Sequence, residues 1–202
     1  MADSNGGALS HPYPLAQLSG AEPLADFRDS VTRTLDIDFP NDYWDRAHCL
    51  ALMGDDDQFW GGAMVIAQPP FRSLESIPNS HSADIERRMD DLQSRVAEVN
   101  GLWLATGKRT QLISFTFWCQ LAEHLLELPI DHFIFTFDPQ NGPMVMLQNW
   151  LSADVLYSGT TLQLPGMRSP QRETIALVSH EAIARFHALL AGRQGAAQLQ
   201  SA

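Results

Sequence analysis

The order of the apolar segments limits this chain to a small group of folds. Two short apolar runs, at 48–53 and 59–67, are separated by the turn sequence Gly54-Asp55-Asp56-Asp57 and predict a β-hairpin. Four later apolar segments predict further strands, at 96–105, 132–137, 153–164 and 173–178. A hairpin followed by strand–helix–strand units predicts an α/β (α+β) fold, with a mixed, mostly antiparallel sheet flanked by helices.

Helical periodicity or cap residues mark the segments between these strands. In the first, apolar residues recur at helical spacings, at Leu24, Phe27, Val31 and Leu35. Ser82 is a favourable N-cap for a later helix, and Pro129 ends a long apolar one because proline cannot continue a helix. The predicted helices span 23–35, 82–95, 110–128, 141–150 and 179–190.

A chain of 202 residues can form one well-packed core and is short for two complete domains. We expect a loose segment at 1–20, a single domain at 21–192 and a frayed tail at 193–202, because both ends are rich in small and polar residues. No run of 18 apolar residues exists, so no membrane span is expected. The N-terminus lacks a secretory signal pattern, and Cys49 and Cys119 are expected to be buried free thiols. Both features indicate the cytoplasm.

The net charge of −11 argues against binding to nucleic acids, because an acidic surface repels phosphate backbones. Five of the thirteen basic residues cluster in one region of the sequence, at Arg87, Arg88, Arg95, Lys108 and Arg109. They form either solvated helix faces or a docking surface for an acidic carrier protein or a phosphate.

A set of charged residues follows the order of a known enzyme family, with matches at Arg28, Asp42, Asp45 and Glu98. The glycine pair Gly61-Gly62 and the proline-rich stretch 68–78 lie between them. In order and spacing this set resembles the acyl-homoserine-lactone synthases, N-acyltransferases with the GNAT fold, and the related long-chain N-acyl amino acid synthases. The chain departs from that pattern at four positions, with Thr32 and Ile37 in place of aromatic residues and Met64 and Gly101 in place of arginines.

The resemblance implies a GNAT-like fold and an N-acyltransferase that moves a fatty acyl group from a thioester donor to a small amine. The donor would be acyl carrier protein or coenzyme A, used as a co-substrate, with no bound cofactor. The product would be an acyl-homoserine-lactone-like molecule, as in autoinducer synthesis for quorum sensing, or an acyl-amino-acid-like molecule. The proline-rich stretch replaces the usual pyrophosphate loop, which favours the carrier protein. The acyl arm implies an opening between the strands at 60–67 and 96–105.

Amide formation from a thioester needs a base for the amine proton and a fixed donor for the thioester oxygen. Glu98 is the candidate base, because it lies inside an otherwise apolar strand, where an unpaired carboxylate would be costly. Alternatively, it faces solvent at the strand start. Asn100 and Gly101 are candidates to free a backbone N–H, since glycine in a strand often marks a bulge. Alternatively, Gly101 serves packing only.

Further residues are expected to contact the amine and the acyl chain of the substrates. Asp42 and Asp45 could hold the substrate ammonium, or could be loop acids that cap the next strand. Arg28 could pair with either acid and order a lid, or could be a solvated helix residue. The acyl slot would be lined by large apolar residues, which otherwise form ordinary core. They are Phe115, Phe117, Trp118, Leu121, Met144, Met146, Leu147 and Trp150.

Other site types find little support in the sequence. It has no Gly-x-Ser-x-Gly nucleophile motif and no HExxH or similar ligand pairing, so no metal is expected. Two functions besides long-chain acyl transfer stay open. One is a GNAT-like fold that has lost catalysis and binds a ligand or a protein, which the four departures favour. The other is an enzyme that uses a short-chain acyl-CoA.

Overall fold

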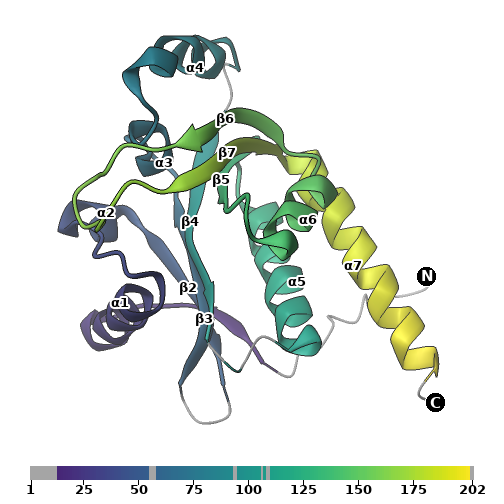
Figure 1. Cartoon of the computed structure of the whole chain (residues 1–202). Helices are drawn as coiled ribbons and strands as arrows, with labels where there is room; N and C mark the ends of the chain where they lie inside the picture. Colours follow the sequence, from purple (N-terminus) through teal and green to yellow (C-terminus); the bar gives the residue numbers. More distant parts are fainter. Residues whose placement is uncertain (1–12, 55–57, 93–94, 106, 108–109, 201–202) are drawn as a thin grey trace.

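The computed structural model describes residues 13–54, 58–92, 95–105, 107 and 110–200. Their strands form one seven-stranded sheet in the order β1-β2-β3-β4-β5-β7-β6 (Figure 1). β4 and β5 are parallel, and the other neighbours are antiparallel. This confirms the predicted fold class. The strands span Leu15–Gln17 (β1), His48–Met53 (β2), Phe59–Ile66 (β3), Val96–Leu104 (β4), His132–Phe137 (β5), Asp154–Thr160 (β6) and Arg172–Ser179 (β7).

Helices cover both faces of the sheet. Figure 1 shows α5, α6 and α7 on one face and α1 and α2 on the other, with α3 and α4 towards one end. The helices span Ala21–Leu35 (α1), Asn41–Arg46 (α2), Arg72–Glu75 (α3), Asn79–Leu92 (α4), Gln111–Glu127 (α5), Gly142–Trp150 (α6) and His180–Gln200 (α7).

Each face of the sheet has its own apolar core, because successive side chains of a strand point to opposite faces. In β5, Phe133 and Phe135 pack in the core under α5 and α7, whereas Ile134 packs in the core under α3 and α4. Phe27 of α1 packs with Met64 of β3 in a third cluster. The strands that look continuously apolar in sequence are therefore those buried on both faces.

Three short elements were not predicted: β1, α2 and α3. Each is too short for a periodic pattern to stand out, and each is fixed by contacts with distant parts of the chain. α7 also extends well past the predicted end at 190. Cys49 and Cys119 are buried free thiols, as predicted. Within the described residues, no helix is long and apolar enough to cross a membrane.

The predicted opening between β3 and β4 is wrong by one strand. β3 and β4 pair from Ile66↔Glu98 to Gly61↔Leu104, with one irregularity. There, two residues of β4 face one residue of β3, which is a β-bulge and bends the strand. β4 pairs with β5 only from Val96 to Val99, so the strands separate where the bulge begins.

Candidate active site in the cleft between β4 and β5

A cleft of about 620 Å³ begins where β4 and β5 separate. Its walls come from β4, the end of β5, the start of α6, the start of β7 and the chain just after α1. Leu35, Ile37, Val99, Asn100, Gly101, Leu102, Thr136, Asp138, Gln140, Asn141, Met144, Gln171, Arg172 and Glu173 line it.

Gly101 forms the bend in the wall of this cleft. Its φ is +58°, in the left-handed region that favours glycine. A Cβ atom at this position would also meet Cε of Met64 on β3. Its N–H donates to Oδ1 of Asn100 at 2.6 Å. The expected bulge is therefore present, but the Gly101 N–H is not free, because the Asn100 side chain accepts from it. β4 continues along the cleft without pairing to β5.

Glu98 lies directly behind this wall and is fully buried, so the solvent-facing alternative is wrong. Oε2 accepts hydrogen bonds from the Tyr43 hydroxyl at 2.9 Å and the Arg72 N–H at 3.1 Å. Oε1 accepts from the Ser73 N–H at 2.6 Å, the Ser73 hydroxyl, and Nδ2 of Asn100 at 3.3 Å. These donors account for a buried charge in an apolar strand.

Two side chains connect Glu98 with the cleft. The hydroxyl of Thr136 donates to Oγ of Ser73 at 3.1 Å, and Ser73 donates in turn to Glu98. Thr136 and Asn100 both line the cleft. The burial of Tyr43 and its contact with Glu98 raise the pKa of the Tyr43 phenol well above its usual value, so this hydroxyl keeps its proton and stays a donor.

Glu173 is an acidic group of the cleft that sequence analysis missed. Burial is the main cause that raises the pKa of its carboxyl, and the negative charges of Asp138 and Glu98 add to the effect, while Arg72 opposes it. Asp138 and Glu173 both line the cleft. The available signal was weak, because Glu173 lies at the start of its strand, beside Arg172, and not inside the apolar run as Glu98 does.

Arg72 is a buried basic residue next to the cleft, and it was also missed, while Arg172 lines the cleft itself. Arg72 is 7% exposed, and burial lowers the pKa of its guanidinium. Nη2 donates to the carbonyl of Pro165 at 2.7 Å, and the guanidinium lies 5.2 Å from the Phe39 ring centroid. It comes shortly after Pro69-Pro70 in the proline-rich stretch 68–78, and its backbone N–H donates to Glu98.

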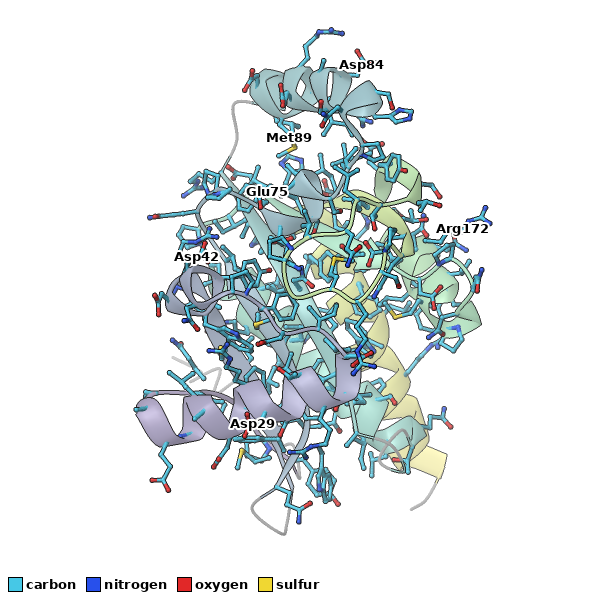
Figure 2. All side chains as sticks on the ribbon, turned by 60° about the vertical axis from the view of Figure 1, so that its left-hand side comes forward. Asp29, Asp42, Glu75, Asp84, Met89 and Arg172 are labelled. Carbon is cyan, nitrogen blue, oxygen red and sulfur yellow. The ribbon has the colours of Figure 1, made fainter. Side chains whose placement is uncertain are left out.

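The predicted lid residues occupy α1 and α2. Arg28 donates to Oδ1 of Asn41 at 2.7 Å and pairs with Asp38 at 3.1 Å, so the predicted pairing with Asp42 or Asp45 is wrong. The start of α2 turns Asp42 and Asp45 outward, where both are exposed. In Figure 2, Asp42 lies at one edge of the molecule and Arg172, which lines the cleft, lies at the other.

The predicted acyl-slot residues do not line one slot. Met144 alone among them lines the cleft. Phe117, Leu121 and Leu147 are buried in the core between the sheet and its helices, and Phe115 and Trp118 pack at its margin. Met146 and Trp150 of α6 are exposed. Helical periodicity identifies the apolar face of a helix, but tertiary packing decides which residues of that face line a cavity and which fill the core.

The three predicted docking residues that the structure describes are engaged in ion pairs outside the cleft lining. Arg87 pairs with Asp84 at 3.2 Å and Arg88 pairs with Asp154. Arg95 pairs with Asp131 at 3.3 Å, at the amino ends of β4 and β5, whereas the cleft opens at their carboxyl ends. Lys108 and Arg109 lie outside the described residues.

No protein-family model and no curated protein sequence matches this chain. Solved structures with similar folds do exist. FeeM, an N-acyl amino acid synthase from uncultured soil microbes, has a TM-score of 0.64 and 12% identity over 85% of this chain and 92% of that chain. A spermidine/spermine N-acetyltransferase, SpeG from Vibrio cholerae, has a TM-score of 0.56 and 10% identity over 85% and 96%. NAA60 from Arabidopsis thaliana, solved with acetyl-CoA, has a TM-score of 0.56 and 9% identity over 84% and 99%. These similarities show a GNAT-like fold.

Proposed function

We propose that this protein is an N-acyltransferase that moves a fatty acyl group from a thioester to a small amine. The observation that carries the proposal is the cleft at the divergence of β4 and β5, with the bulge at Gly101 on one side and Glu173 on the other. This places a strand edge and an acid of raised pKa in one cavity. The fold shared with an N-acyl amino acid synthase and with N-acetyltransferases supports the same chemistry.

In this reaction the amine nitrogen attacks the thioester carbonyl carbon, and the carbon–sulfur bond then breaks. The amine loses a proton, and the leaving sulfur takes one up as a thiol. We assign the first proton transfer to Glu173, directly or through one water, because an acid whose pKa is raised towards the working pH is a better base. Backbone N–H groups of β4 beyond Val99, other than that of Gly101, which donates to Asn100, are candidates to meet the negative oxygen of the intermediate.

Glu98, Asn100 and Gly101 support this cleft. Glu98 is buried behind it and reaches it only through other side chains, so we assign it a positioning role. Asn100 connects the Glu98 carboxylate to the Gly101 N–H. This contact fixes the bulge, and the bulge sets the shape of the cleft wall.

An amine that enters as an ammonium ion suits the negative charge of Asp138 and Glu173. Arg28, Asp42 and Asp45 would act at a distance from the cleft, through the position of the chain between α1 and α2. Leu35 and Ile37, which follow Arg28 on the same segment, line the cleft. The contact of Arg28 with Asn41 holds this segment against α2.

Product formation tests the proposal directly. The purified chain is incubated with long-chain acyl-CoA, or with the same acyl group on acyl carrier protein, and with homoserine lactone, amino acids and polyamines as acceptors. Mass spectrometry detects the acyl amine. Glu173→Gln should lose the reaction, and Glu75→Gln, an exposed acid on α3, should keep it. Equal rates in both variants would remove Glu173 from the mechanism.

The donor is identified by comparing the two thioesters. If an acyl carrier protein docks on the basic residues, replacing Arg87 and Arg88 with Glu should slow turnover with the carrier at low ionic strength and leave turnover with acyl-CoA unchanged. An acyl-homoserine-lactone or acyl-amino-acid product would agree with a role in autoinducer synthesis.

The second candidate is a binding module that has lost catalysis. It is favoured by apolar packing at the family's arginine positions, where fully buried Met64 lies against Gly101. The two candidates differ in outcome. A binding module would retain a stoichiometric acyl thioester or amine and release no free thiol.

A further inference from the structure

Cys119, Glu123 and His187 come together on the helical face of the sheet, and none of them lines the cleft. Cys119 and Glu123 lie one turn apart on α5, so their side chains share one face of that helix. His187 belongs to α7, which lies beside α5 (Figure 1). Their three ligand atoms, Sγ, a carboxylate oxygen and a ring nitrogen, all lie within 4.8 Å of one another.

We propose that these three residues form a zinc-binding site that joins α5 to α7. The donor set selects the metal class. A thiolate and an imidazole prefer zinc and other late transition metals, whereas magnesium and calcium prefer oxygen ligands. Three protein ligands leave a fourth tetrahedral position for water or another small ligand.

The distances between the side chains are close to those of such a site. With zinc–sulfur bonds of about 2.3 Å and zinc–nitrogen or zinc–oxygen bonds of about 2.0–2.2 Å, neighbouring ligand atoms of a tetrahedron lie about 3.3–3.6 Å apart. Sγ of Cys119 lies 3.9 Å from Oε1 of Glu123. That oxygen lies 3.1 Å from Nε2 of His187. The third pair, Sγ of Cys119 and the His187 ring nitrogen, lies within 4.8 Å. Side-chain rotations would have to bring all three pairs into range.

The three side chains differ in exposure, so the site has both a protected sulfur and an opening to solvent. The Cys119 side chain is fully buried, while the side chains of Glu123 and His187 are 37% and 26% exposed. The ion can therefore enter past the carboxylate and the imidazole and bind the thiol beneath them. On binding, the Cys119 thiol loses its proton to solvent, and His187 binds through its neutral Nε2.

The sequence does not reveal this site, because its ligands come from two helices and match no metal motif. The site is independent of acyl transfer. A zinc ion would bridge α5 and α7, two of the helices on one face of the sheet, and loss of catalysis at the cleft would leave its binding unchanged.

The test is a titration of the untagged full chain with Co²⁺, followed by competition with Zn²⁺, under reducing conditions. A site with Cys119 gives a thiolate-to-cobalt charge-transfer band that saturates at one ion per chain and is displaced by Zn²⁺. The band should be absent in Cys119→Ala and unchanged in Cys49→Ala, a second buried thiol in a different core cluster.

His187→Asn supplies a second measurement at a partly exposed position, where the fold is expected to survive and circular dichroism verifies it. Binding should weaken by at least about tenfold, since even the loss of an outer-shell partner costs about 10–100-fold in metal affinity. Zn²⁺ should raise the Tm of the wild type and of Cys49→Ala, and should do so only at higher concentration in His187→Asn. A wild-type chain with no thiolate–cobalt band, or a band that survives Cys119→Ala, would overturn the proposal.

Discussion

Replacing Glu98 with Gln should destabilise the protein, although the two side chains have nearly the same shape. Both carboxylate oxygens of Glu98 face donors only. A glutamine must place its NH₂ group against one of these two sets. The less costly orientation puts the NH₂ group beside Tyr43 and Arg72. There the Tyr43 hydroxyl can rotate and accept a hydrogen bond from the NH₂ group, whereas the Arg72 N–H can only donate and is left without an acceptor.

The magnitude follows from that orientation. One buried backbone N–H without an acceptor costs about 1–3 kcal/mol. The hydrogen bonds that remain also weaken, because those to an ionised acceptor are roughly twice as strong as neutral ones. We expect a loss of about 2–4 kcal/mol in the free energy of unfolding. At about 2–4 °C for each kcal/mol in a chain of this size, the Tm should fall by about 4–16 °C.

Thermal and urea unfolding of Glu98→Gln measure this loss, and Glu75→Gln is the matched control. Glu75 lies on α3, beside the residues that donate to Glu98, but its side chain is exposed. Surface substitutions of this kind usually change stability by less than about 0.5 kcal/mol. If the two variants unfold within about 0.5 kcal/mol of each other, the five-donor account of Glu98 is incorrect.

Three further predictions address the cleft and its approach. Because the fold raises the pKa of Glu173, the native state binds more protons than the unfolded state above the ordinary glutamate pKa. Wild-type stability should therefore fall as pH rises through that window, while Glu173→Gln should not show the fall; identical pH profiles would contradict this. Gly101→Ala should cost about 1–2 kcal/mol for its positive φ and more for the contact with Met64, so chemical denaturation should rank it below Gly107→Ala, which has positive φ in open space. Arg28→Ala should cost at most about 1 kcal/mol, and the difference from wild type should shrink in high salt; a larger, salt-independent loss would mean that packing on Trp44 dominates.

The candidate site was partly predictable from sequence. An acid inside an apolar strand marked Glu98 as a special residue, and a glycine in the same strand marked the bulge at Gly101. The sequence could not distinguish a base in the cleft from a buried anchor behind it, because that depends on α2 and α3, two helices too short to predict. Glu173 was missed because it belongs to the cleft only through strand pairing. It lies at the start of β7, and Asp138, its acidic neighbour in the cleft, follows β5, so the two are far apart in the sequence.

The order of hairpin, helices and strands was determined by the sequence alone, because alternation and helical spacing depend on contacts within a few residues. The tertiary structure decided where the cleft opens. Strand separation depends on which segments pair and on where a bulge bends one of them, and the prediction therefore placed the opening one strand away, between β3 and β4. The same reason applies to Cys119 and His187, since their meeting depends on α5 and α7 packing side by side on the sheet.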